Sequence, residues 1–371
     1  MGALLHEPCG LSAVARGRVE IKAGLVRLSL VYHNKSSYDQ PMSSKVSPPD
    51  LTTATAAADK QKYRVMNWPE YNRALEKRGN ITLLLSTEVI EGWYSSAAPQ
   101  QGAQQKYSDT CIEAIMLLKT VIRLAYRQVR GFTVGLLSLL KLGDLDVPSY
   151  TQIARRFRTL DIAPFTIPAT GPLTIAIDST GVKVYGEGEW KCRKHGWSKR
   201  RTWRKLHLGV DPATSFIHCH TTTTNDQSDA SQLEDLLDQL TTEPVAEACL
   251  DGAYDSAACI DGLLKRGIRP VIPPQRGAVE WYRFEPGDLV DYPRNVAIRR
   301  IDEIGRAGWK KEVVYHRRSL SETAMYRYKT IFGPQHYARS LSTQMQENKM
   351  KVKALNQMTA HGMPISRPKV A

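Results

Sequence analysis

The sequence lacks the features expected of a secreted or membrane-embedded chain. Its six cysteines are scattered without a CxxC pair, which in a chain of 371 residues favours reduced thiols over a disulfide framework. The opening stretch "MGALLHEPCGLSAVARGR" has no continuous apolar core of signal-peptide length. The most apolar stretch, residues 111–142, is interrupted by Lys119, Arg123, Arg127 and Arg130, so it does not resemble a membrane span. We therefore expect a cytoplasmic, nucleoid-associated protein with no membrane partner.

Acidic residues are scarce relative to basic ones. The chain has 51 Lys and Arg against 37 Asp and Glu, a formal net charge of +14. Such an excess favours a polyanionic partner, although a merely soluble basic protein is the simpler alternative. The length leaves room for two domains, or for one large domain with an added arm.

Residues 1–60 differ in composition from the rest. The stretch "KSSYDQPMSSKVSPPDLTTATAAADKQK" is rich in Ser, Thr, Pro and Ala and has no sustained periodicity. This composition predicts a disordered or weakly ordered arm. Upstream sequence translated from an early start codon is the alternative.

Residues 61–168 have the pattern of a helical region. A helix is expected between Asn67 and Gly79, a second along the apolar stretch from residue 109 to Tyr126, and a third over 132–142. A basic helix should then begin at Pro148 and Ser149, with three arginines facing largely outward: Arg155, Arg156 and Arg158. Helix, short connection and basic helix are compatible with a helix-turn-helix DNA reader. An ordinary amphipathic helix with solvated arginines fits equally well.

A Pro-rich linker, "DIAPFTIPATGP", precedes a change of pattern. "LTIAID" predicts a buried strand, and "WRKLHLGVD" and "SFIHCHTTTT" predict an antiparallel hairpin. "SDASQLEDLLDQL", "AEACLDG", "SAACIDGLLKRG" and "RPVIPP" then predict helix, strand, helix and strand. The order predicts a mixed α/β domain over 169–340, interrupted by a polar insertion at 275–311. A helical tail is expected over 341–371.

Two acids follow apolar strand patterns, Asp178 in "LTIAID" and Asp251 in "AEACLD". Ligands gather at strand ends in α/β sheets, so these carboxylates should converge if the strands are neighbours. Close carboxylates favour a hard cation such as Mg²⁺, and Glu322 would add a third oxygen ligand. Three such acids suit two metal ions about 3.5–4 Å apart that act on a phosphodiester.

Each acid also has a purely structural interpretation. An Asp after a strand is often a turn former or a helix cap, although Asp255 is the better predicted cap for the next helix. Glu322 lies three residues after Ser319, the spacing of a capping box.

The stretch "WKCRKHGWSKRRTWRK" holds eight Lys or Arg and three Trp in sixteen residues, with no acid. Cations bind phosphate without regard to sequence, and aromatic rings stack on unpaired bases. The predicted phosphate-binding residues are Lys191, Arg193, Lys194, Lys199, Arg200, Arg201, Arg204 and Lys205. A solvated basic loop is the simpler alternative. A zinc site is disfavoured because the spacing of Cys192, His195, His207, His218, Cys219 and His220 fits no standard finger.

Tyr315, Arg318, Glu322 and Lys329 have the spacing Y-(2)-R-(3)-E-(6)-K. Together with "IAIDSTGVKV", "HGWSKRRTWRKLHLGVD", "CLDGAYDS", "SETAMYRYK" and "ALNQMTAHGMP", this spacing resembles the DDE transposases of bacterial insertion sequences, in particular the insertion-sequence-five family, over about residues 61–365. The resemblance implies an RNase H-like catalytic core and DNA transposition. It implies that Asp178, Asp251 and Glu322 are the catalytic metal ligands, for Mg²⁺ or alternatively Mn²⁺. Arg318 and Lys329 should then meet phosphates near the cut, and Tyr315 should pack or bond the backbone there.

The leading hypothesis is a transposase that binds terminal inverted repeats through residues 61–168. It would use water and then a DNA 3′-hydroxyl as nucleophile, and would act as a homo-oligomer on double-stranded end and target DNA. A metal nuclease without strand transfer is the second hypothesis. A DNA-binding regulator or inactive relic is the third, which the intact acid trio disfavours.

Overall fold

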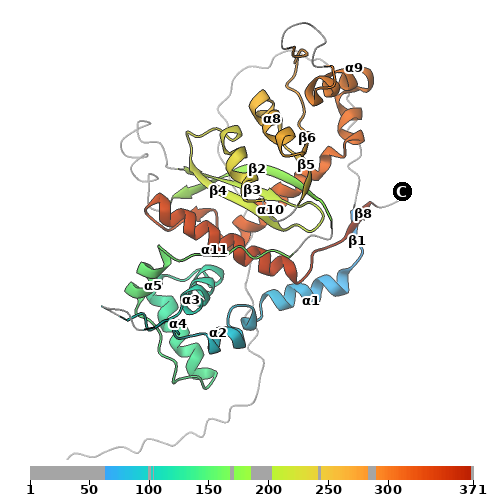
Figure 1. Cartoon of the computed structure of the whole chain (residues 1–371). Helices are drawn as coiled ribbons and strands as arrows, with labels where there is room; N and C mark the ends of the chain where they lie inside the picture. Colours follow the sequence, from blue (N-terminus) through green and yellow to red (C-terminus); the bar gives the residue numbers. More distant parts are fainter. Residues whose placement is uncertain are drawn as a thin grey trace, which may run out of the picture. The chain divides into compact units, whose positions relative to one another are not determined.

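The computed structural model describes residues 63–98, 102, 104–167, 171–184, 203–240, 244–282 and 290–368. The chain divides into two units, Met1–Lys60 and Gln61–Ala371, and every described residue belongs to the second (Figure 1). The arm expected over 1–60 therefore lies outside the described residues. So does most of the basic stretch, from residue 185 to residue 202.

The described residues form a mixed α/β fold around a six-stranded sheet, as expected for an RNase H-like core. Its main order is β4-β3-β2-β5-β6, and β7 pairs with the end of β2. The strands β2, β3 and β4 are antiparallel neighbours, whereas β5, β6 and β7 run parallel to their partners. Their bounds are β2 Leu173–Val184, β3 Trp203–Val210, β4 Ile217–Thr224, β5 Val245–Cys249, β6 Arg269–Val271 and β7 Gln335–His336.

Alternation along β2 gives the sheet two packed faces (Figure 1). Ile175 and Ile177 pack into one cluster with the short helices α7 (Leu233–Leu237) and α8 (Ala257–Lys265). Ala176 and Val182 belong to the opposite face, which is covered by α9, α10 and α11. These helices span Pro293–Glu312, Ser319–Phe332 and Leu341–Ala360. Asp178 has the same parity as Ala176, so it faces the α10 side.

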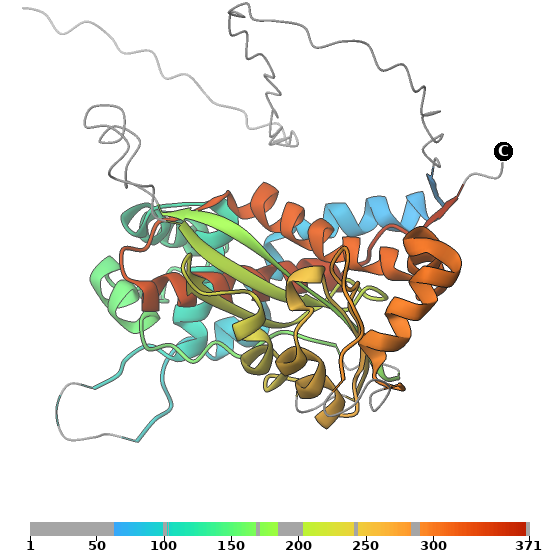
Figure 2. The ribbon, with the colours of Figure 1, turned by 90° about the horizontal axis from the view of Figure 1, so that it is seen from above.

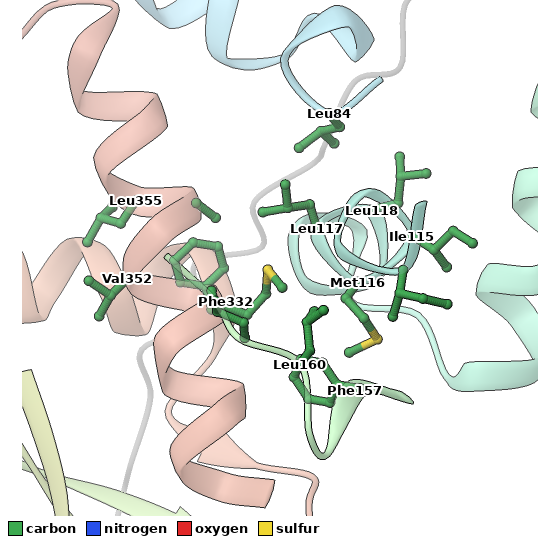
Figure 3. Packing of buried hydrophobic residues seen from close by; sticks show 14 of the residues in the cluster. Leu84, Ile115, Met116, Leu117, Leu118, Phe157, Leu160, Phe332, Val352 and Leu355 are labelled. Atoms are coloured by element: carbon green, nitrogen blue, oxygen red, sulfur yellow. The ribbon is translucent and has the colours of Figure 1, made fainter. Parts of the chain in front are cut away.

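In the described part of the helical region before the sheet there are five helices and one 3-10 turn: α1 Trp68–Arg78, η1 Ile81–Leu83, α2 Thr87–Glu91, α3 Asp109–Ile122, α4 Tyr126–Leu139 and α5 Tyr150–Phe157. Side chains from α3, α5, α10 and α11 meet in one apolar cluster, which Figure 3 shows from close by. The helical region predicted over 61–168 therefore packs on the elements that cover the sheet, and both belong to the unit Gln61–Ala371.

Two predictions within this region need correction. The helix expected to run on to Tyr126 ends at Ile122, because Arg123 adopts a left-handed conformation and α4 begins three residues later. The helix expected over 132–142 is the second half of α4. The connection from α4 to α5 covers residues 140–149, longer than the three or four residues of a helix-turn-helix turn. The start of the basic helix is as predicted, with Ser149 as cap.

The helix α11 is a central element and does not form a peripheral tail. Met350, Val352 and Leu355 are buried against the sheet and the helical region. Its buried Asn356 donates to the carbonyl oxygens of Phe165 and Ile217, both at 2.8 Å, and accepts from the Ile217 N–H at 3.0 Å. The helix is therefore joined to β4 by satisfied buried polar contacts as well as by apolar packing.

The insertion expected over 275–311 consists largely of the helix α9, which packs through Trp309 on the sheet. The two ends of the described unit meet in a small antiparallel sheet, β1 (Tyr63–Val65) with β8 (Ser366–Pro368), and Figure 2 shows these strands side by side. None of the helices in the described residues is long and apolar enough to span a membrane.

Candidate active site

Strand register brings the first two acids level with one another. β2 and β5 are parallel, and their last paired residues are Ala176 and Cys249. Asp178 and Asp251 each lie two residues beyond that pair, so they stand at the same height along neighbouring strands. Parallel strands lie about 4.8 Å apart. This register is the one that the predicted convergence of the two carboxylates requires.

The position of Asp178 differs from the prediction in one respect. It lies in the middle of the twelve-residue β2 and does not end the strand. β2 continues to Val184 because β3 pairs with it from Ala176 to Lys183 and β7 pairs with its end. The open edge needed for a ligand arises because β5 stops at Cys249 while β2 goes on.

Asp251 caps a short turn, although the sequence pattern assigned the capping role in this stretch to Asp255. Its Oδ1 accepts from the Ala253 N–H at 2.9 Å and caps the short 3-10 turn η3, Gly252–Tyr254. Asp255, the expected cap of the next helix, instead pairs with Arg294 at 2.8 Å, and Ser256 caps α8. The cap leaves the second carboxylate oxygen of Asp251 for another partner, since no further bond to it occurs within the described residues.

Arg318 joins Glu322 to Asp178. Its guanidinium donates to Asp178 Oδ2 at 2.6 Å and to Glu322 Oε1 at 2.7 Å. The capping box predicted from Ser319 and Glu322 does not form, because Ser319 is already the first residue of α10 and its hydroxyl donates to the His316 carbonyl. Glu322 faces the strand acids through Arg318 and keeps 57% of its side chain exposed.

Tyr315 and Lys329 complete the same segment. Tyr315, in the 3-10 turn η4 (Tyr315–Arg318), donates to the Leu250 carbonyl at 3.1 Å and so holds the residue before Asp251. This is the backbone bond expected of it. Lys329 lies two helical turns beyond Glu322, on the same face of α10, and donates to the Thr180 hydroxyl at 2.6 Å. Because its partner is neutral, the charge of Lys329 is not compensated there.

The charge of Asp178 is costly in this setting. Burial raises the pKa of its carboxyl above the ordinary value, and the negative charge of Asp251 raises it further, whereas Arg318 opposes the shift. A carboxylate held next to another carboxylate with little solvent favours the binding of a cation.

The donor chemistry of Asp178, Asp251 and Glu322 fits a divalent cation, because hard cations prefer carboxylate oxygens. Within the described residues, however, no group of three or more His, Cys, Asp or Glu side chains is arranged to hold a metal ion. The Arg318 guanidinium bridges Asp178 and Glu322 and supplies the positive charge in its place. A cation held by all three acids therefore requires Arg318 to release at least one of them.

This arrangement predicts that Arg318 and a divalent cation compete. In Arg318→Gln, the cation-free protein should lose about 1–3 kcal/mol of unfolding free energy, because the Asp178 carboxylate loses its charged partner. Its melting temperature should then rise more on adding Mg²⁺ or Mn²⁺ than that of the unaltered protein. Thermal melting with and without the ion measures both effects.

Arg317→Gln is the matched control. Arg317 bonds Glu247 and Thr174, away from the three acids, so its loss should destabilise the protein without changing the shift that the ion produces. Equal ion-induced shifts in Arg318→Gln and the unaltered protein would contradict the competition.

Two residues that the sequence did not indicate lie beside the acids. Asp229 accepts from the Ser179 hydroxyl at 2.8 Å and from Lys205 Nζ at 3.1 Å. The buried Tyr254 hydroxyl has no hydrogen-bond partner among the described residues, and burial together with the charges of Asp229, Asp251 and Asp178 raises its pKa. The only sequence signal for Tyr254 was its place three residues after Asp251.

The predicted DNA-binding cations have different surroundings. Arg204 bonds the Gln344 side chain at 2.7 Å, and Lys205 bonds Asp229 and the Gln227 carbonyl. In α5, Arg156 pairs with Asp109 and bonds the Tyr107 carbonyl, so it does not face outward as predicted, whereas Arg155 and Arg158 are exposed. Six of the predicted residues lie outside the described residues: Lys191, Arg193, Lys194, Lys199, Arg200 and Arg201.

Two domain-family models match the chain, and both are described as a transposase DDE domain. One covers residues 76–187 and the other residues 169–357, which is just over half of the chain.

Three solved structures are similar at low identity. A piggyBac transposase synaptic complex with hairpin DNA has 9% identity over 81% of this chain and 77% of that one, with a TM-score of 0.33. A simian T-cell lymphotropic virus intasome in complex with PP2A regulatory subunit B56 gamma has 14% identity over 62% and 67%, with a TM-score of 0.24. A pre-cleavage Mos1 transpososome has 11% identity over 73% and 84%, with a TM-score of 0.20.

Proposed function

Because the chain belongs to the DDE transposase family, we propose that it cuts DNA at the ends of a mobile element and joins those ends to a target. The observation that carries the proposal is the placement of three acids from separate parts of the chain around β2 and Arg318. β2 and β5 bring Asp178 level with Asp251, and Arg318 ties Glu322 to Asp178. The finer assignment is to the insertion-sequence-five group, on the spacing of Tyr315, Arg318, Glu322 and Lys329.

DDE transposase domains generally use divalent metal ions. Asp178, Asp251 and Glu322 would hold them here, two Mg²⁺ ions in our proposal. When bound, such ions favour ionisation of the attacking oxygen and stabilise charge on the leaving oxygen. The chain itself orients these acids: Tyr315 fixes the backbone before Asp251, and Arg318 holds Asp178 and Glu322 together.

The cations of the same segment suit phosphate groups. Lys329 is part-buried, burial lowers the pKa of its ammonium group, and its hydrogen-bond partner is the neutral Thr180 hydroxyl. A phosphate oxygen near Lys329 would restore the charge balance. Arg318, once it releases a carboxylate, would present the same fork of donors to a phosphate. We propose that double-stranded ends lie along this face of β2 and α10, with water and then a 3′-hydroxyl as nucleophile.

The remaining assignments extend this proposal to the partners of the chain. The exposed Arg155 and Arg158 would take part in binding terminal inverted repeats, and a homo-oligomer would hold two ends together. The net charge of +14 supports a polyanionic partner.

A strand-transfer assay separates the three hypotheses. Purified protein, Mg²⁺, a labelled duplex carrying the element's terminal repeat and a supercoiled target plasmid should yield both cut ends and label joined to the plasmid. A nuclease without transfer would give cut ends alone. An inactive relic would shift the duplex in a gel and give neither product, which would overturn the proposal.

A further inference from the structure

A cavity lies between the helical region and the catalytic core, away from the three acids. Residues of α3, α4 and α5 line one side, and residues of α10, α11 and the segment between them line the other. Its volume is about 530 Å³. Ligand pockets typically measure about 300–1,000 Å³, so this cavity can admit a small organic molecule.

The cavity is lined partly by apolar side chains, which form its wall, and partly by Lys and Arg side chains. Met116, Phe157 and Phe332 lie buried behind the wall, and Figure 3 shows them among the side chains where the helices meet. The partly buried Leu124 and Tyr126 give the wall its accessible apolar surface. Five cations also line the cavity: Lys119, Arg123, Arg158, Arg339 and Lys351. Its one acid, Glu347, bonds Lys351 at 2.8 Å and the N–H groups of Tyr337 and Ala338. Among the described residues, Glu347 forms no ion pair with the other four cations of the lining.

The positive charge of Lys119 is in an unfavourable environment in this cavity. Its ammonium lies 4.9 Å from the centre of the Tyr126 ring, and no carboxylate of the described residues is within ion-pair distance of it. Burial lowers the pKa of Lys119, and attraction by the nearby Glu347 opposes this shift without cancelling it, which means that the positive charge is poorly solvated. An anionic group in the cavity would compensate that charge.

Arg123 is also held in an unfavourable way. It ends α3 with φ 61° and ψ 41°, a left-handed conformation that glycine adopts most easily. Across from it, Gly333 gives room to the guanidinium, since a Cβ there would lie 2.8 Å from Arg123 Nη2. A glycine would end this helix with less strain, whereas the arginine places a guanidinium in the cavity lining, where it bonds the Tyr337 hydroxyl.

We propose that this cavity binds a nucleotide, with the ring against the partly buried Leu124 and Tyr126 and the phosphate at Lys119 and Arg123. A cavity of this size exceeds the needs of a lone phosphate, and a purely apolar ligand would leave the cations uncompensated. A nucleotide turned out of bound DNA and a free nucleotide share this chemistry. The first source rests on the proposed function, and the second does not.

Isothermal titration of the full chain with thymidine 5′-monophosphate tests the proposal, with thymidine and inorganic phosphate as part-ligands. The monophosphate should bind at least about tenfold more tightly than either part, because ring and phosphate contacts act together. Displacement of the monophosphate by a single-stranded decathymidylate would identify DNA as the source, and failure of the oligonucleotide to compete would identify a free nucleotide.

Arg123→Gly gives the sharper test, because it should change stability and binding in opposite directions. Its melting temperature should rise, since glycine relieves the left-handed strain, while the affinity for the monophosphate should fall about tenfold or more with the loss of a charged contact. Lys141→Gly is the matched control: Lys141 also has a positive φ of 60° but does not line the cavity. That variant should be stabilised and bind the monophosphate normally.

No binding of the monophosphate at millimolar concentration, or unchanged affinity in Arg123→Gly, would overturn the proposal. The titration uses neither a divalent ion nor a cleavable DNA end. Its failure would therefore leave the transposase proposal intact, and a protein that binds the monophosphate without cutting DNA would leave this inference intact.

Discussion

Purified Asp178→Asn and Asp251→Asn proteins should bind an end-containing duplex in a gel shift and fail to cut it. Asparagine keeps the shape of each side chain but removes the charge that a divalent ion needs. Metal assistance supplies several kcal/mol to the transition state, so the Mg²⁺-dependent cleavage rate should fall about 1,000-fold or more. Retained cleavage in either protein would show that the replaced acid is not a metal ligand.

Stability distinguishes this effect from simple unfolding. Burial makes the charge of Asp178 costly and Arg318 offsets that cost, so Asp178→Asn, which removes the charge but keeps an acceptor for Arg318, should melt close to the unaltered protein without metal. Asp211→Asn is a matched control in the connection between β3 and β4. Asp211 is buried and accepts from Ala213 and Thr214, so its replacement should lower the melting temperature and leave the cleavage rate of the folded protein unchanged.

Glu322→Gln should fold, bind DNA ends and neither cut nor join them. The amide oxygen of Gln can still accept from Arg318, so the contact within the helix is largely kept, and the exposed position of Glu322 makes the stability loss small, at most about 1 kcal/mol. The lost negative charge, by contrast, should lower cleavage and strand transfer by orders of magnitude.

Ser319→Ala provides the comparison within the same helical turn. The Ser319 hydroxyl only donates to the His316 carbonyl, so its removal should cost at most about 1 kcal/mol and leave DNA cleavage near normal. Rates should be compared for both variants at a temperature where each is folded by circular dichroism. Near-normal cleavage by Glu322→Gln would mean that Glu322 is only an ion-pair partner of Arg318 and not a metal ligand.

The order of strands and helices in the core could be predicted because each element has its own periodic pattern. The length of β2 could not. The three residues after Asp178 are small or polar, and the strand continues through them because β3 and β7 pair with it. Similarly, Arg123 ends α3 without a Gly or Pro to mark the end, so the sequence showed one continuous helix.

The central position of α11 could not be predicted from the sequence for a related reason. Its Asn348 and Asn356 look like solvent-facing residues in sequence, yet both are buried, and their partners come from β4, α10 and the segment before the sheet. Burial of a polar side chain depends on partners distant in sequence, which a local pattern cannot show.

The three acids themselves could be proposed from sequence, because their neighbours in the chain are distinctive. Their connection through Arg318 could not be deduced that way. The capping-box spacing of Ser319 and Glu322 was a sound local pattern, but α10 begins one residue earlier than that pattern needs, after the turn of η4. Asp229 and Tyr254 were missed because nothing in their local sequence sets them apart.

The number of residues between Tyr315 and Glu322 fixes the direction in which the Glu322 carboxylate points. Tyr315 is fixed to the end of β5 and Arg318 to the middle of β2, so the number of residues that follows decides where Glu322 points. One inserted residue between Arg318 and Glu322 would turn the carboxylate by about 100° around the helix axis and carry Lys329 with it. The count of residues in this segment is therefore under as much constraint as their chemistry, and an insertion there should be tolerated less well than many substitutions.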